Sequence, residues 1–237
     1  MTRFIVLTLF KEMFDGFLNT SIIKRAIDEE KVSVDVIDIR DFSLNKHKKV
    51  DFPPYGGGSG MVMSCEPLAG AIDYATQILS KYDNDIKIIY LSPRGKLLNY
   101  NISNKLAKTK ANYILVCGHY EGIDERIIEE YKIEEISIGD YVLTGGELAS
   151  QVLMDSIIRL IPGVINEESL NEESHTNNLL EYPQYTKPDD FRGRKVPDIL
   201  KTGNHKKIAD FRKNESIRIT KKNRTELLKK YNNINKT

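Results

Sequence analysis

The amino-acid sequence predicts an α/β fold with a mostly parallel sheet, followed by a small helical C-terminal domain. Short apolar, β-branched runs alternate with helical patterns through the first 165 residues, as in chains whose parallel strands are joined by helices. A polar segment without apolar periodicity interrupts this pattern, and a basic, helix-like sequence follows it. The length of 237 residues, of which 40% are hydrophobic, is enough for one large core and a smaller one.

Five runs are expected as strands and three longer stretches as helices. The strand candidates are residues 4–10, 32–39, 86–92, 113–117 and 133–138. The helix candidates are residues 65–81, 124–131 and 146–160, the last of which ends before Pro162 and Gly163. These elements place a first domain at residues 1–165, a flexible linker at 166–178 and a helical basic domain at 179–237. The apolar positions of the third segment include Ile208, Phe211, Ile217, Leu227 and Leu228.

The net charge of +1 hides an asymmetry along the chain. Residues 183–237 hold 16 Lys and Arg against 6 Asp and Glu, which leaves 19 against 28 for residues 1–182. A basic module of this kind suits a polyanion such as RNA, because Lys and Arg release the counterions condensed on phosphates. A solvated helical surface explains the charge alone equally well.

Neither a membrane segment nor a metal-binding cysteine motif is recognisable in the sequence. No apolar run approaches the roughly 20 residues of a membrane helix, and the amino terminus lacks the pattern of a secretion signal. We therefore expect a cytoplasmic protein that does not bind membranes. Cys65 and Cys117 have no CxxC spacing, so neither a disulfide framework nor a zinc site is indicated. Both are expected to be small buried side chains, and no metal ligands are predicted.

Two glycine-bearing loops are candidates for ligand contact. Residues 54–61 (PYGGGSGM) precede a helix, and glycines there allow a positive φ and a close approach to the backbone. A flexible turn explains them equally well, and the stretch is not the GxGxxG dinucleotide fingerprint. Residues 91–95 (LSPRG) end a buried strand, where open α/β sheets bind ligands, although a plain turn also explains Pro93 and Gly95.

A third loop, residues 117–126 (CGHYEGIDER), gathers several ionisable side chains directly after a strand. Glu121 could accept hydrogen bonds from a purine edge. Asp124 and Glu125 better suit the first turn of the next helix, where a negative charge offsets the helix dipole.

A fourth loop, residues 138–147 (IGDYVLTGGE), follows the last expected strand. Its backbone amides and carbonyls could hold an adenine, and its paired glycines would let two chain segments cross closely. The next helix carries Asp155 and Arg159 four residues apart, a spacing that by itself favours a surface salt bridge for Arg159.

Seven stretches, in order and at compatible spacing, resemble the signatures of bacterial tRNA (guanine-N1)-methyltransferases. The resemblance runs from about residue 4 to about residue 228. A single motif would be weak, but seven together are specific. The stretches are residues 54–61, 91–95, 118–126, 138–147, 159–163, 182–188 (YPQYTKP) and 196–205.

The resemblance implies a fold and a cofactor. Members belong to the knotted methyltransferase class (SPOUT), so a deep trefoil knot is expected, which periodicity could not have shown because chains are usually unknotted. They bind S-adenosylmethionine in the knot and work as homodimers whose active sites lie between chains. The residues that would line the cofactor pocket are Tyr90, Leu91, Ser92, Pro93, Gly95, Gly118, Tyr120, Glu121, Ile138, Gly139, Asp140, Tyr141, Val142, Leu143, Gly145 and Gly146.

The reaction that the resemblance implies needs a base and a cation. Guanine N1 carries a proton that must leave as the methyl group arrives, and negative charge then develops on O6. The family's arginine falls on Arg159 and its general base, usually an aspartate, falls on Glu173. Because this linker is one residue shorter, Glu172 competes for the role of base. His175 is a candidate by its ordinary pKa alone.

The partner that the resemblance implies is the anticodon stem-loop of tRNA, methylated on the guanosine 3′ of the anticodon. Ribose 2′-O methylation, or an inactive RNA-binding relative, are the alternatives. Magnesium is raised by the resemblance, yet no carboxylate spacing marks a dedicated site, so the ion could be carried by the RNA. The candidate phosphate contacts are Lys187, Arg192, Arg194, Lys195, His205, Lys206 and Lys207.

Overall fold

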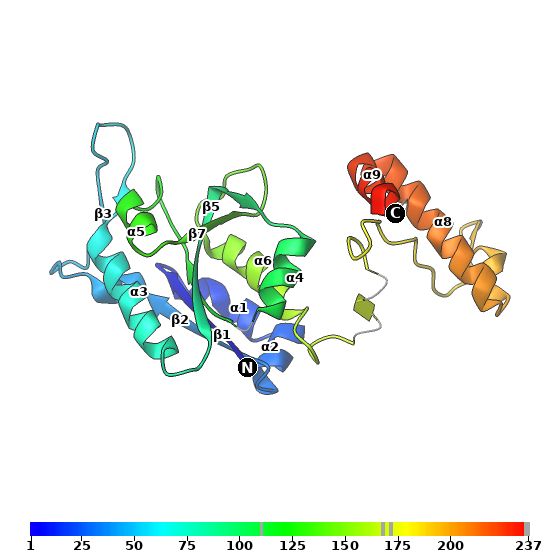
Figure 1. The fold of residues 1–237 in the computed structure, drawn as a ribbon, viewed down its shortest axis with the longest axis horizontal. Helices are drawn as coiled ribbons and strands as arrows, with labels where there is room; N and C mark the ends of the chain where they lie inside the picture. The colour runs from blue at the N-terminus through cyan, green and yellow to red at the C-terminus, as the bar shows by residue number, and fades with distance from the viewer. Residues whose placement is uncertain (110, 167–168, 171–172, 235–237) are drawn as a thin grey trace. The chain divides into compact units, whose positions relative to one another are not determined.

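A computed structural model describes residues 1–109, 111–166, 169–170 and 173–234. The chain divides into two compact units, Met1–Ile165 and Asn166–Thr237 (Figure 1). Each unit has its own packed elements, and they are described separately. The flexible linker expected at residues 166–178 stays a prediction.

The first unit is built on a five-stranded parallel sheet. Its strands lie in the order β2 (Val32–Asp38), β1 (Thr2–Thr8), β6 (Ala111–Val116), β5 (Asp85–Leu97) and β7 (Glu134–Ser137). All four neighbouring pairs are parallel, which confirms the predicted α/β class. β5 continues beyond the predicted end at residue 92, because a bulge between Leu91 and Lys96 lets it rejoin β7.

Helices cover both faces of the sheet (Figure 1). Alternate residues of β1 enter two separate cores, Phe4 and Val6 on one face, Ile5 and Leu7 on the other. A strand that is buried on both faces has a continuous apolar sequence, and this is why these strands could be predicted from the sequence. The first face packs against α1 (Asp15–Leu18), α2 (Ser21–Asp28), α4 (Tyr100–Lys108) and α6 (Glu147–Ile158). The second face packs against α3 (Cys65–Leu79) and α5 (Glu125–Glu130).

Smaller elements extend the carboxyl ends of the strands. The 3-10 helices η1 (Lys11–Phe14) and η2 (Ile39–Phe42) follow β1 and β2. The glycine-rich residues 54–61 form the tip of a hairpin between β3 (Asp51–Phe52) and β4 (Val62–Met63). Cys117 is buried as predicted, whereas Cys65 is only half-buried, since it lies at the start of α3; both thiols are free.

The second unit is helical, as predicted, and carries a short hairpin that was not predicted. β8 (Asp190–Phe191) pairs with β9 (Arg194–Lys195), and η3 (Asp198–Lys201) follows. The long helix α8 (His205–Asn223) begins after Asn204, whose side chain accepts the Lys207 N–H at 3.1 Å, and α9 (Thr225–Ile234) packs beside it. Among the described helices, none is both long and apolar enough to cross a membrane.

Candidate functional site

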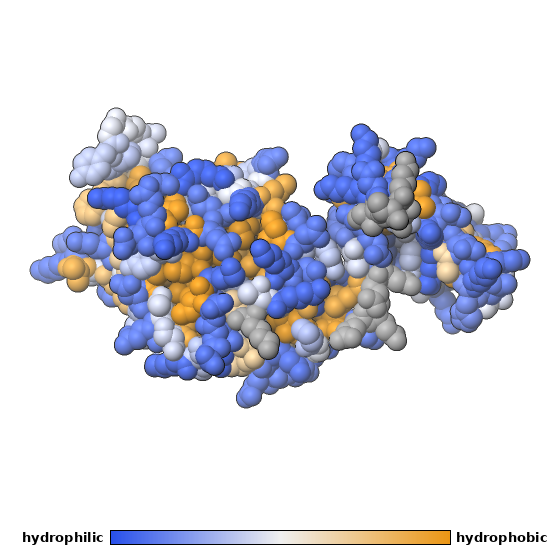
Figure 2. All heavy atoms as spheres, in the orientation of Figure 1, coloured by the Kyte–Doolittle hydropathy of each residue, from blue (hydrophilic) through white to orange (hydrophobic). Residues whose placement is uncertain are grey.

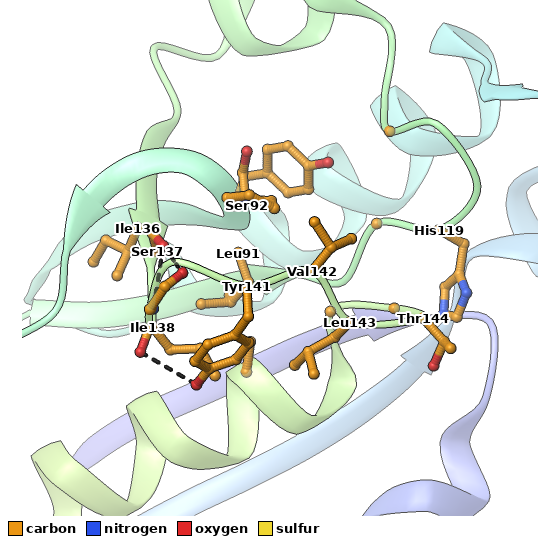
Figure 3. A pocket seen from close by; sticks show the side chains of 18 of the residues that line it. Leu91, Ser92, His119, Ile136, Ser137, Ile138, Tyr141, Val142, Leu143 and Thr144 are labelled. Carbon is orange, nitrogen blue, oxygen red and sulfur yellow. Dashed lines mark hydrogen bonds between the residues drawn. The ribbon is translucent and has the colours of Figure 1, made fainter.

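A cavity of about 210 Å³ opens at the bulge of β5 and at the carboxyl ends of β6 and β7 (Figure 3). Its walls are residues 90–93 within β5, residues 118–122 after β6, and residues 136–139 and 141–146 at and after the end of β7, together with Ala149 of α6. Parallel strands direct their carboxyl ends to one edge of the sheet, so loops far apart in sequence meet there. Three of the four loops singled out in the sequence therefore contribute to one cavity.

The cavity combines apolar side chains with unused backbone donors. Leu91, Val142 and Leu143 contribute apolar surface, and Ser92 and Ser137 contribute hydroxyl groups (Figure 3). The backbone N–H groups of residues 141–143 donate to no group within the described part of the chain. An apolar slot edged by free main-chain amides suits a flat heteroaromatic ring with polar edges, such as adenine.

The Tyr90 ring forms a buried wall of the cavity. Burial raises the pKa of its phenol, so the group stays neutral near pH 7. The ring lies against Gly118, where an added Cβ would come within 2.7 Å of it. Gly118 therefore leaves room for an aromatic wall that a larger residue would displace.

The fourth loop crosses the end of β6 at van der Waals distance. Gly146 donates its N–H to the Gly118 carbonyl at 3.0 Å, and a Cβ on Gly146 would lie 2.8 Å from the Cys117 Cα. Gly145 forms an isolated antiparallel bridge with His119. The predicted close crossing at these two glycines is thus confirmed.

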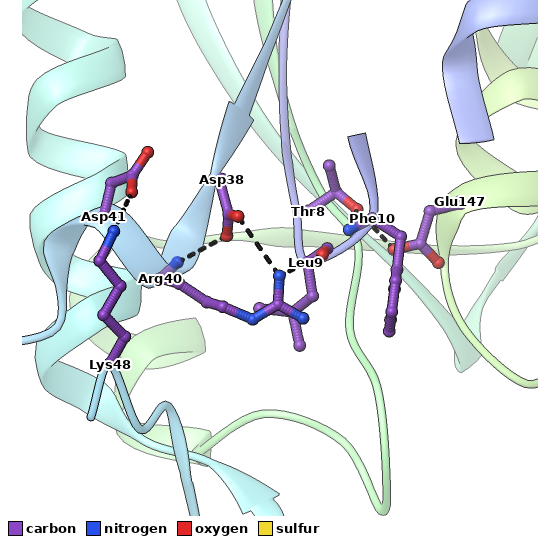
Figure 4. A network of polar contacts seen from close by, with 8 residues as sticks. All are labelled: Thr8, Leu9, Phe10, Asp38, Arg40, Asp41, Lys48 and Glu147. Carbon is purple, nitrogen blue, oxygen red and sulfur yellow. Dashed lines mark hydrogen bonds and ion pairs between the residues drawn. The ribbon is translucent and has the colours of Figure 1, made fainter. Parts of the chain in front are cut away.

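A buried polar network lies beside this crossing (Figure 4). Glu147 is 1% exposed and accepts a hydrogen bond from Thr8 Oγ1 at 2.6 Å. Its two carboxylate oxygens each lie 2.8 Å from His119 Nε2. Nearby, Arg40 donates to the Leu9 carbonyl at 2.6 Å and fastens the turn after β2 to the turn after β1.

The third loop divides into a capping part and a cavity-lining part. The Asp124 side chain accepts the Arg126 N–H at 3.0 Å at the start of α5, and the Arg126 guanidinium holds the Asp124 pKa well below its usual range. The structural role predicted for Asp124 is confirmed. Glu121 lines the cavity, and its side chain packs against Gly60, where a Cβ would lie 2.3 Å from Glu121 Oε1. Through this contact the glycine-rich hairpin also reaches the site.

Comparison with known proteins identifies the family to which the chain belongs. A family model described as tRNA (Guanine-1)-methyltransferase TrmD matches residues 2–230. A tRNA (guanine-N(1)-)-methyltransferase of Clostridioides difficile (strain 630) is 53% identical, with 97% of this chain and 99% of that protein aligned. The enzyme of the same name from Ruminiclostridium cellulolyticum is 51% identical, with 98% and 99% aligned. The chain belongs to the TrmD family.

Fourteen of the sixteen residues expected to hold the cofactor line the cavity of this TrmD family member, and Gly95 and Asp140 do not. Gly95 instead packs against β7, where an added Cβ would lie 2.4 Å from the backbone of Glu135 and Ile136. Six lining residues were not singled out as cofactor contacts, although most adjoin residues that were. They are His119, Gly122, Ile136, Ser137, Thr144 and Ala149.

The two residues expected to be catalytic belong to different units. Arg159 is half-buried and ends α6 in the first unit. Glu173 is half-buried in the second unit and lines a cavity there with Tyr182, His205 and other residues. Glu172, the competing base, lies outside the described residues. Burial lowers the pKa of His175, so its imidazole is mostly neutral at pH 7.

Carboxylates, histidines and cysteines do not gather into an ion site in the described residues. No group of three or more of them is arranged to hold a metal ion there. The methyltransferase family to which the chain belongs implies the use of S-adenosylmethionine, and the adenine-sized slot with free backbone amides fits that cofactor.

Proposed function

We propose that this TrmD family member transfers a methyl group from S-adenosylmethionine, bound in the cavity of the first unit, to N1 of the guanosine 3′ of the anticodon in tRNA. The observation that carries this proposal is the cavity at the bulge of β5 and the ends of β6 and β7, where three segments within the family match meet. Near-complete alignment with curated tRNA (guanine-N(1)-)-methyltransferases supports it. In the bound state the cofactor supplies a sulfonium methyl group.

The protein's part in the reaction is to move one proton and to stabilise one developing charge. We assign the Glu173 carboxylate to remove the proton from guanine N1, and the Arg159 guanidinium to stabilise the negative charge on O6. Glu173 lies in the segment that follows the first unit, and Arg159 lies at the end of α6.

The second unit is proposed to bind the anticodon stem-loop. It contains residues 183–237, in which 16 Lys and Arg stand against only 6 Asp and Glu. Its visible face is mainly hydrophilic (Figure 2). A basic, polar surface suits phosphate contacts. The candidate contacts Lys187, Arg192, Arg194, Lys195, His205, Lys206 and Lys207 are all exposed.

A homodimer is proposed from the exposed apolar residues of the first unit. Large hydrophobic areas are visible on its surface (Figure 2). Leu148 and Val152 lie one turn apart on α6 and are 49% and 46% exposed, and Val142 beside the cavity is 82% exposed. Packing these side chains against a second copy of the chain would remove their apolar surface from contact with water, which favours association.

Val152→Glu is therefore expected to convert the dimer to a monomer and to abolish methyl transfer, because the family's active sites lie between chains. Light scattering coupled to gel filtration measures the mass. Leu44→Glu is the matched control, since Leu44 is 87% exposed outside this surface and the dimer should persist. A dimeric Val152→Glu protein would show that α6 is not at the interface.

Three finer features complete the proposal. We place the trefoil knot at residues 138–146, since this segment leaves β7 at one edge of the sheet and returns to cross the end of β6. We assign any magnesium requirement to the RNA, which carries its own ions. The reaction takes place in the cytoplasm, where tRNA and the methyl donor meet.

The decisive experiment is incubation of the protein with labelled S-adenosylmethionine and unmodified tRNA. The expected product is 1-methylguanosine, identified after complete nuclease digestion, and partial digestion to oligonucleotides should place it 3′ of the anticodon. A labelled dinucleotide that resists alkaline hydrolysis would instead identify ribose 2′-O methylation. Donor binding without any labelled product would identify an RNA-binding protein that has lost catalysis.

A further inference from the structure

A buried carboxylate beside the cavity has no part in the proposed chemistry. Glu147 is the first residue of α6, where the free amides of the helix start favour a negative charge. Burying a charge is costly unless partners hold it, and Thr8 and His119 are the partners here. Thr8 is 139 residues away in sequence, and His119 lies on the cavity wall. The network therefore links the end of β1 to the cavity.

The directions of the hydrogen bonds place the imidazole proton. The Thr8 hydroxyl accepts the Phe10 N–H at 2.9 Å, so its single proton is directed to Glu147. If the Glu147 carboxylate carries no proton, it can only accept hydrogen bonds, which puts the His119 proton on Nε2. In a neutral imidazole, Nδ1 is then a hydrogen-bond acceptor.

Packing closes most of the His119 ring and leaves Nδ1 open. The ring meets Phe10 edge to face at a centroid distance of 4.9 Å, and a Cβ on Gly145 would lie 2.3 Å from its Cε1. The side chain is 13% exposed and borders the cavity (Figure 3). Within the described part of the chain, Nδ1 has no hydrogen-bond partner and is not fully buried, on a ring that borders the cavity.

We propose that His119 Nδ1 accepts a hydrogen bond from S-adenosylmethionine, and that Glu147 and Thr8 are positioning residues that hold the imidazole as the Nε2–H tautomer. This inference rests on the proposed function of the cavity. The cofactor offers two groups of the required chemistry, the ribose hydroxyls and the amino group of its methionine part. Both present an acidic hydrogen to a nitrogen acceptor.

Titration calorimetry with S-adenosylhomocysteine tests this assignment on two substitutions at one position. Glutamine carries its amide nitrogen where Nε2 lies, so His119→Gln keeps a donor toward Glu147 but has no acceptor at the Nδ1 position. We expect an unchanged melting temperature and about tenfold weaker binding, the effect of one lost hydrogen bond. Asparagine carries its amide at the Nδ1 position, so His119→Asn should bind more tightly than His119→Gln and melt lower.

The outcomes separate the possible explanations. If His119→Gln binds S-adenosylhomocysteine as tightly as the wild type does, the contact at Nδ1 is disproved while the cavity assignment stands. If the wild type binds none, the proposed function fails as well. Repeating the titration with 5′-methylthioadenosine locates the contact: an equal loss points to the ribose, and a loss seen only with S-adenosylhomocysteine points to the amino group.

Nitrogen NMR of the imidazole rings provides a readout that a purely structural role would not change. The chain has four histidines, and the His119→Gln spectrum identifies the resonances of His119. We expect an unprotonated Nδ1 whose resonance moves when S-adenosylhomocysteine is added, while Nε2 keeps its proton. A protonated Nδ1, or one that does not respond to the ligand, would overturn the proposal.

Discussion

Replacing Glu173 with glutamine is expected to slow methyl transfer by about 10²–10⁴-fold, the usual contribution of a general base. The amide has nearly the same size as the carboxylate but cannot take the proton from guanine N1 at neutral pH. Donor binding should be unchanged, since the cavity that we assign to the donor lies in the first unit and Glu173 lies in the second. Single-turnover kinetics with labelled donor and unmodified tRNA measure the rate, and calorimetry measures donor binding.

Two further variants make the test specific. Glu173→Asp should retain most of the rate, because the carboxylate remains. Glu172→Gln is the matched control, with the same chemical change one residue earlier. A slow Glu172→Gln enzyme beside a fast Glu173→Gln enzyme would move the base to Glu172. If both variants react at the wild-type rate, the base does not come from this pair.

The sheet could be predicted because its strands are buried on both faces. Residues such as Phe4, Ile5, Val6 and Leu7 are all fully buried, so the run is apolar without alternation. The continuation of β5 could not be predicted, since Pro93 and Gly95 read as a turn. In the structure they form a bulge, after which the strand pairs with β7 again. Whether β5 continues depends on its pairing with β7, and the local sequence around Pro93 and Gly95 does not show which strand lies beside it.

The cavity could be located because the family resemblance assigned its lining to loops that parallel topology brings to one edge of the sheet, and most residues expected there line it. The polar network beside it could not. Glu147 follows two glycines and reads as an ordinary first-turn acid of a helix. Its burial depends on Thr8, from the opposite end of the unit's sequence, and on His119. Contacts of this kind depend on the tertiary fold and cannot be predicted from the spacing of residues along the sequence.

Gly95→Ala is expected to lower the stability of the first unit rather than to act mainly on the cofactor. The added Cβ would lie 2.4 Å from the carbonyl carbon of Glu135 and from the nitrogen of Ile136, both backbone atoms of β7. The backbone of a paired strand cannot rotate away from the added methyl group as a side chain can, so β5 and β7 must move apart. Overpacking of this kind costs about 1–3 kcal/mol, which lowers the melting temperature by several degrees.

Gly118→Ala is the matched control for this prediction, because its added Cβ meets the Tyr90 side chain instead of backbone. The ring can move into the cavity that it borders, so stability should change little while S-adenosylhomocysteine binding weakens. Thermal melting should therefore show a lower melting temperature mainly for Gly95→Ala. Calorimetry should show weaker S-adenosylhomocysteine binding mainly for Gly118→Ala. If Gly95→Ala melts at the wild-type temperature but binds the donor more weakly, Gly95 belongs to the cofactor site after all. The bulge of β5 would then accommodate the added methyl group more easily than its contacts with β7 imply.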